Sequence, residues 1–147
     1  MGARMIASAT PIHIATINGV SVRFFRGPAD GPDMPWHAHE ELLVALALPR
    51  ELRRALRAAL LKSWKEACHT VEVDGEPVLI APHFVAQGLI GMAQEIGKGI
   101  STTPDRVDRE YARAGVAAMN ALTAHIPAAA DRFTWAMQAF HNQGGAA

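Results

Sequence analysis

The sequence contains a single cysteine, Cys68, among its 147 residues. An intrachain disulfide is therefore excluded, and so is a zinc site made of several cysteines. No segment approaches the roughly 18 consecutive apolar residues of a membrane-spanning helix, and the first residues lack the apolar stretch of a signal peptide. We therefore expect a cytoplasmic protein with no membrane partner.

The sequence also lacks a net charge, because 14 Lys and Arg residues balance 14 Asp and Glu residues. A global attraction to nucleic acid or to a membrane surface is thus not expected. The charge is unevenly distributed, however, since residues 50–65 carry a net charge of +5 and the remainder −5. Such a local asymmetry indicates a binding surface better than the net charge does. Its basic residues are Arg50, Arg53, Arg54, Arg57, Lys62 and Lys65.

Two motifs that would identify a ligand are missing. Gly88 and Gly91 lie in a helical pattern and lack the Lys-Ser/Thr pair that ends a phosphate-binding loop. Aromatic residues make up 6% of the chain, and Trp64 alone is no platform on which single-stranded nucleic acid would stack. We expect neither a cofactor nor a catalytic residue.

Two β-hairpins are predicted by their turns. Asn18-Gly19 joins strand-like residues 12–17 and 20–25, and Asp74-Gly75 joins 70–73 and 77–81. Both dipeptides suit a tight hairpin, because its two central residues need positive φ. Five helices are predicted from apolar periodicity and helix-ending prolines. They cover residues 36–48, 50–69, 81–97, 103–126 and 129–142.

The predicted fold is a single α+β domain, in which two β-hairpins pack with about five α-helices. It covers residues 12–142, with a frayed N-terminus over 1–11 and a flexible tail over 143–147. In the helix 81–97, we expect an inward stripe of Val85, Leu89, Met92 and Ile96, with a neighbour packed closely against Gly88 and Gly91. The last helix has an apolar side that indicates either a dimer contact or additional core. This side contains Phe133, Ala136, Met137 and Phe140.

The helix 50–69 is predicted to be apolar on one side and basic on the other. An arc of Leu52, Ala55, Leu56, Ala59, Leu60 and Ala67 is expected to face the core. The opposite basic side suits nucleic-acid phosphates or an acidic protein partner. The alternative is an ordinary solvated helix face. If the side binds DNA, replacing Arg53 and Arg54 with Glu should remove binding and leave the fold intact.

The remaining titratable residues allow a metal-site interpretation. In a strand, His37 and His39 would face the same side and bind one ion, whereas in a helix they would diverge. Because the following residues look helical, we expect both histidines to be exposed at a helix start. The acidic side chains of Glu40 and Glu41 would interact favourably there with the positive end of the helix dipole. His83 and His69 are expected to lie at helix ends. Cys68 is expected to be a small buried thiol.

Several segments resemble the BRO-type N-terminal domain of phage antirepressors and viral BRO proteins. The strand Val20–Phe25, the Pro-Trp start of a helix at 34–46, the hairpin and helix at 70–97 and the segment 109–113 are similar to that family's order of features. The family's usual glycine after the first helix is replaced here by Leu48-Pro49. The resemblance implies transcriptional control in a phage or prophage, by DNA binding or by capture of a repressor, without catalytic residues.

The sequence thus predicts a regulatory binding protein of phage or mobile-element type that acts on transcription through a basic DNA-binding helix. One alternative is a protein–protein inhibitor, an antirepressor or another antagonist of a host protein, that makes no DNA contact. A third interpretation is a metal-dependent enzyme that uses His37 and His39. A homodimer is a further expectation, from the apolar side of the last helix.

Overall fold

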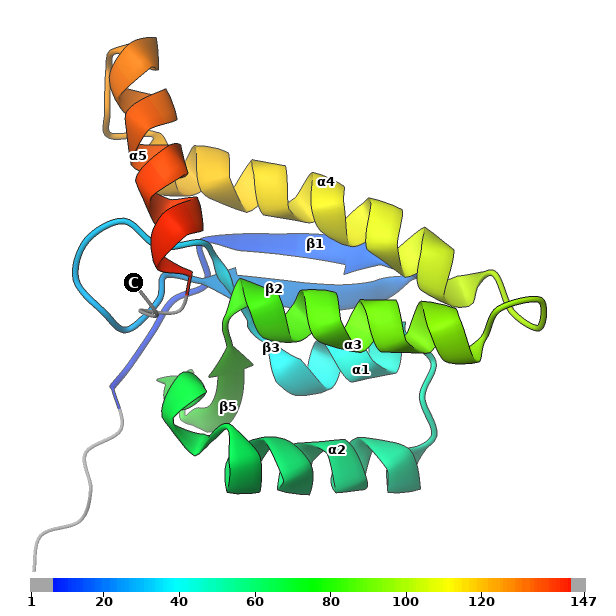
Figure 1. Cartoon of the computed structure of the whole chain (residues 1–147). Coiled ribbons are helices and arrows are strands. Elements are labelled where there is room, and N and C mark those ends of the chain that lie inside the picture. The colour runs from blue at the N-terminus through cyan, green and yellow to red at the C-terminus, as the bar shows by residue number, and fades with distance from the viewer. Residues whose placement is uncertain (1–6, 144–147) are drawn as a thin grey trace, which may run out of the picture.

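The computed structural model describes residues 7–143 as a five-stranded antiparallel sheet with helices packed against it (Figure 1). The α+β class is confirmed, while the expected flexible ends at residues 1–6 and 144–147 lie outside the described residues. The strands are β1 (His13–Ile17), β2 (Val20–Phe25), β3 (Trp36–Ala38), β4 (His69–Val73) and β5 (Glu76–Ala81), in the order β1-β2-β3-β5-β4. The helices are α1 (His39–Ala45), α2 (Arg50–Ser63), α3 (His83–Ile96), α4 (Thr103–Thr123) and α5 (Ala129–Asn142), with a 3-10 turn η1 (Lys65–Ala67).

Both predicted hairpins form with the predicted turns. Asn18 and Gly19 have φ of 48° and 76°, and Asp74 and Gly75 have φ of 50° and 83°. Positive φ at both central residues matches the right-handed twist of the flanking strands. The turns therefore fix the registers of β1 with β2 and of β4 with β5.

The central strand β3 was not expected, because residues 36–48 were predicted to form one helix. Residues Trp36–Ala38 instead pair with β2 on one side and β5 on the other, so that β3 joins the two hairpins into one sheet. All three residues of β3 are buried, and a fully buried strand lacks the alternating pattern that identifies a half-exposed one. Helix α1 begins at His39.

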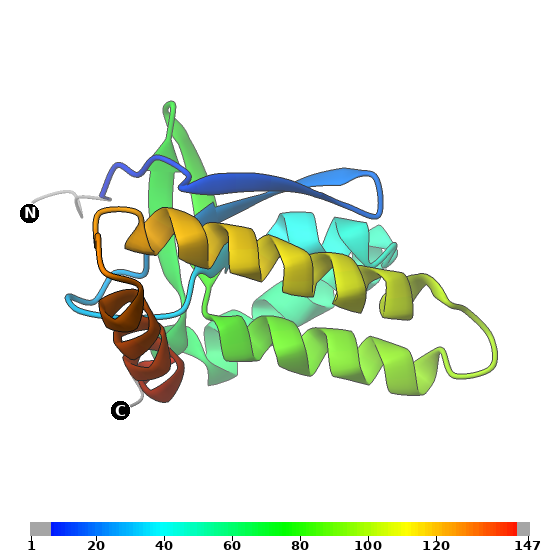
Figure 2. The same ribbon diagram turned by 90° about the horizontal axis from the view of Figure 1, so that it is seen from above.

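The main core lies between the sheet and the helices on one of its faces. Helix α4 packs on β1, α1 packs on β2, and α3 lies beside α4 (Figure 2). One apolar stripe of α4 is buried in this core, as the apolar periodicity of residues 103–126 indicates, and the side chain of Ile126 beyond the helix end is half-buried. A smaller apolar cluster that includes Phe25 and Trp36 covers the other side of the sheet. The buried residues of the α4 stripe are Val107, Tyr111, Ala114, Ala118 and Leu122.

Helix α1 ends in a turn that is built around an alanine. Ala47 has φ of 59°, the left-handed conformation that usually belongs to glycine after a helix. The N–H of Leu48 donates to the carbonyl of Leu43 at 3.2 Å, and that of Ala47 donates to Val44 at 2.9 Å. This hydrogen-bond pattern satisfies the last carbonyls of α1 and directs the chain into α2.

The described part of the N-terminal segment runs beside the sheet. The N–H of Ala9 donates to the carbonyl of Glu72, and the N–H of Glu72 donates to Ala7, each at 2.9 Å. These hydrogen bonds place residues 7–9 along the outer edge of β4. Within residues 7–143, no helix combines the length and the apolar character that crossing a bilayer requires.

Candidate functional site

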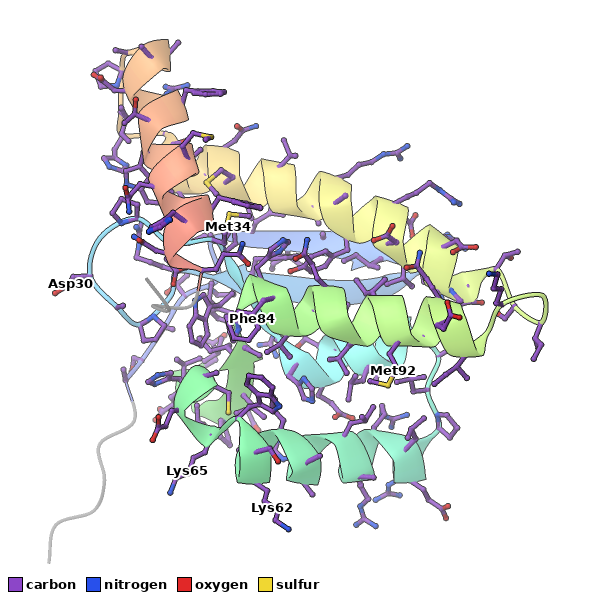
Figure 3. The ribbon with its side chains drawn as sticks, in the orientation of Figure 1. Asp30, Met34, Lys62, Lys65, Phe84 and Met92 are labelled. Atoms are coloured by element: carbon purple, nitrogen blue, oxygen red, sulfur yellow. The ribbon has the colours of Figure 1, made fainter. Side chains whose placement is uncertain are left out.

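Helix α2 is a peripheral helix whose basic side faces solvent. Figure 3 shows Lys62, near the C-terminal end of α2, and Lys65, in η1, pointing away from α3. Five of the six predicted basic residues are exposed and form no ion pair with any residue that the structure describes. We call these five residues the basic face: Arg50, Arg54, Arg57, Lys62 and Lys65.

Arg53 has a different role from the other five basic residues. Its Nε donates to Oε1 of Glu40 at 2.8 Å, and its Nη1 donates to the carbonyl of Leu48 at 2.8 Å. Its side chain is half-buried against α1. The side chain of Arg53 therefore stabilises the packing of α2 on α1 and is not available to bind a partner. The equivalent acid on the other side of α1, Glu41, binds Arg23 of β2.

The apolar side of α2 is largely uncovered, contrary to the prediction. Only Leu60 is fully buried, in a small cluster with Cys68, Leu79 and Ala81. Leu52 is 44% exposed, and Ala55 and Ala59 are also exposed. The helix was also predicted to continue to His69, but it ends at Ser63 and His69 begins β4.

An apolar groove lies between α2 and α3. It has a volume of about 470 Å³, and none of its lining residues carries a formal charge at neutral pH when His39 is neutral. Figure 3 shows Met92 pointing from α3 toward α2. We call this feature the α2–α3 groove. Its lining residues are His39, Leu56, Ala59, Leu60, Ser63, Trp64, Phe84, Val85, Gly88, Leu89 and Met92.

The predicted inward stripe of α3 is confirmed only in part, because Val85 and Leu89 pack against buried clusters whereas Met92 and Ile96 do not. Ala86 and Ile90 are the buried residues of α3, whereas Met92 is 50% exposed and Ile96 is 72% exposed. Both Val85 and Leu89 line the groove. The larger apolar residues of α3 therefore face a space that the described chain leaves unfilled.

Gly88 keeps the groove open on its α3 side. A Cβ built at Gly88 meets no atom within 4 Å, and the same holds for Gly91. The predicted close packing against these glycines is therefore wrong. Glycine in a helix interior is about 1 kcal/mol less favourable than alanine. The presence of such glycines is the sequence signal that could have indicated an open groove as well as close packing. The rings of Trp64 and Phe84, with centroids 6.1 Å apart, close one end.

Two histidines, His37 and His83, contact Tyr111, and a third, His39, lines the groove. The ring of His83 stacks on Tyr111, and its Nδ1 lies 3.1 Å from the tyrosine hydroxyl. The ring of His37 contacts Tyr111 edge-on, with centroids 6.1 Å apart. Both His37 and His39 are buried, so the predicted exposure at a helix start is wrong. Neither ring nitrogen of either histidine has a hydrogen-bond partner within the described chain.

Burial keeps these histidines neutral at physiological pH. Burial, together with the nearby His39 and His83, lowers the pKa of His37 to about 3. The pKa of His39 is lowered by burial and by Arg57, against the opposing effect of Glu40. That of His83 is lowered by burial. Each imidazole is therefore a neutral group that can donate or accept a hydrogen bond.

The two residues of the metal-site interpretation, His37 and His39, belong to different elements but lie near each other. His37 contacts Tyr111 from β3, whereas His39 begins α1 and lines the groove. Among residues 7–143, no three His, Cys, Asp or Glu side chains are grouped as metal ligands. Cys68 is buried as expected, and burial raises its pKa. His83 lies at the start of α3, as expected, and no side chain makes a capping hydrogen bond there.

Comparisons of the chain with protein-family models, with curated proteins and with solved structures gave no match.

Proposed function

We propose that this protein is a regulatory module that binds double-stranded DNA through the basic face of α2. The observation that carries the proposal is the basic face itself: four cations on the outer side of the peripheral helix α2 and Lys65 of η1 next to it, without an acidic partner among the described residues. The sequence resemblance to BRO-type domains, which implies transcriptional control, agrees with this proposal.

The dimensions of α2 suit the proposed contact. Its 14 residues extend about 21 Å at 1.5 Å per residue. The DNA major groove is about 12 Å wide and admits an α-helix. The apolar side of α2 faces the α2–α3 groove, so the basic side is turned away from the rest of the protein. A duplex can therefore approach without displacing any part of the fold.

The proposal is tested with two double variants that change the net charge equally, one in α2 and one in α4. Arg50→Glu/Arg54→Glu alters the basic face, and Arg109→Glu/Arg113→Glu alters exposed arginines of α4 by an equal charge. We expect the α2 variant to weaken binding to a mixed-sequence duplex by at least about 100-fold at low salt, and the α4 variant to weaken it much less. Equal losses in the two variants would contradict a localised DNA contact.

Capture of an acidic protein through the same face is the second candidate function. The zero net charge of the whole chain favours it, because free DNA-binding domains usually carry a net positive charge. Contacts to phosphates weaken steeply with salt. Recovery from a host lysate of a protein partner whose complex survives about 0.5 M salt would therefore support this candidate. It requires the same α2 residues, so Arg50→Glu/Arg54→Glu should also release that partner.

A further inference from the structure

Helix α5 carries an apolar stripe that no described part of the chain covers. Phe133 is 71% exposed, Met137 is 60% exposed and Phe140 is 57% exposed. They occupy positions i, i+4 and i+7, the spacing with which an amphipathic helix enters a groove on a partner. Only Ala139 of α5 is fully buried. Within the described chain this side of α5 is therefore not part of the core, and the expectation of a dimer contact stays a prediction.

The α2–α3 groove shows the complementary pattern. Four α2 residues that line it are spaced i, i+3, i+4 and i+7, and four α3 residues repeat this spacing. Two helix faces with that spacing accept a third helix between their side chains. The α2 residues are Leu56, Ala59, Leu60 and Ser63, and the α3 residues are Val85, Gly88, Leu89 and Met92.

We propose that α5 of one copy lies in the α2–α3 groove of a second copy, and that the second copy returns the same contact. The stripe and the groove are both apolar, so the contact desolvates no Asp, Glu, Lys or Arg side chain. Charged groups that end up unpaired would otherwise reduce the affinity. Gly88 leaves the space that a phenylalanine ring of the stripe needs.

The area of the contact is sufficient for a stable dimer. At about 200 Å² for each large side chain, the exposed fractions leave roughly 370 Å² of the stripe in solvent. Two reciprocal contacts, each covering the stripe and the lining of the groove, would bury roughly 1,000–1,500 Å², which reaches the size of a specific protein interface. A single contact would fall below that size. A two-fold arrangement also closes the assembly at two copies.

The first test compares Gly88→Gln with Gly91→Gln by sedimentation equilibrium. Both glycines lie in α3 with open space around them, but only Gly88 lines the groove. We expect the unaltered protein to be a dimer at about 100 µM, Gly88→Gln to raise its dissociation constant at least tenfold and Gly91→Gln to preserve it. Thermal unfolding of both variants should be unchanged or slightly raised. A monomeric unaltered protein, or equal effects of the two variants, would overturn the proposal.

The second test asks whether α5 is the occupant. Phe133→Gln/Phe140→Gln removes the stripe but leaves the groove, and Gly88→Gln removes the groove but leaves the stripe. Each variant alone should be monomeric, and a mixture should form a one-to-one complex through the one intact contact, with a weaker affinity than the dimer of the unaltered protein. A mixture that stays monomeric would overturn the assignment of α5 to the groove, as would assemblies larger than a dimer in the unaltered protein. This inference does not depend on the basic face, so failure of DNA binding would leave it standing.

Discussion

Arg53 on α2 donates through Nε to Oε1 of Glu40 on α1 at 2.8 Å. The pair joins two consecutive helices across the turn at residues 46–49. It divides the basic residues of 50–65 into one that stabilises the fold and five that face solvent, four of them in α2 and one in η1. Replacing Arg53 together with Arg54, as the sequence suggested, would therefore mix a structural effect with a binding effect.

Single replacements separate these two roles. Arg53→Met should lower the free energy of unfolding by about 1 kcal/mol, because it removes a half-exposed ion pair and a hydrogen bond to a backbone carbonyl. Arg54→Met should change stability by less than about 0.5 kcal/mol and should weaken DNA binding. Chemical denaturation and a DNA titration of both variants check this pair. A larger loss of stability in Arg54→Met would contradict the division.

Ala47→Gly should stabilise the protein. Ala47 has φ of 59°, a conformation that costs an L-residue with a Cβ about 1 kcal/mol more than it costs glycine. The expected gain in the free energy of unfolding is about 1 kcal/mol, reduced somewhat by the greater freedom of glycine in the unfolded chain. Denaturant unfolding measures it, with Ala58→Gly in the exposed side of α2 as a control that should lose stability.

Gly27→Ala should destabilise the loop before β3. A Cβ at Gly27 would lie 2.6 Å from Nε1 of Trp36 and 2.7 Å from Oδ2 of Asp33. These two atoms form a buried hydrogen bond of 2.9 Å, so the new methyl group must displace it. The free energy of unfolding should fall by about 1–3 kcal/mol. Gly31→Ala tests the backbone effect alone, because a Cβ at Gly31 would meet no atom within 4 Å but the residue has φ of 90°. A greater loss of unfolding free energy in Gly31→Ala than in Gly27→Ala would contradict the steric explanation.

Stability should fall as the solution becomes acidic. The folded protein holds the pKa of His37 at about 3, below its ordinary 6.5, so between these values the unfolded chain binds a proton that the folded chain does not. Above pH 6.5 neither state is protonated at His37, and the histidine adds no pH dependence. Below it, stability should decrease by up to about 1.4 kcal/mol per pH unit. The lowered pKa values of His39 and His83 act in the same direction.

The variant His37→Phe isolates this effect from the protonation of carboxylates. It removes one titrating ring from the buried cluster and keeps an aromatic ring beside Tyr111. Urea unfolding of both proteins between pH 7 and about pH 4 should show a shallower decline for the variant. Parallel curves for the two proteins would mean that His37 does not titrate with unfolding.

The sequence predicted those elements that local chemistry determines. Asn18-Gly19 and Asp74-Gly75 identify their hairpins because few other dipeptides accept two positive φ values. The stripe of α4 follows from helical periodicity over 21 residues. In contrast, Trp36–Ala38 is a strand only because β2 and β5 lie on either side of it. The burial of His37 and His39 depends on that strand, so the sequence could not reveal it.

Of the candidate site, the sequence predicted only which residues carry the positive charges. The basic residues of α2 are evident from residues 50–65, but the partner of Arg53 lies 13 positions away on another helix. Periodicity also identifies the apolar faces of α2, α3 and α5 without telling whether the same chain covers them. The structure leaves Leu52, Met92 and Phe133 exposed, and this exposure indicates the groove and the stripe.

The most direct test of the proposed function is the salt dependence of DNA binding. Fluorescence anisotropy of a labelled mixed-sequence duplex is measured with the unaltered protein at several salt concentrations. Five phosphate contacts, one for each residue of the basic face, predict a slope of log affinity against log salt near −4.5, or about a 500-fold loss between 0.05 and 0.2 M. Binding with this slope would support contact through the basic face, whereas no binding at 0.05 M salt would contradict it.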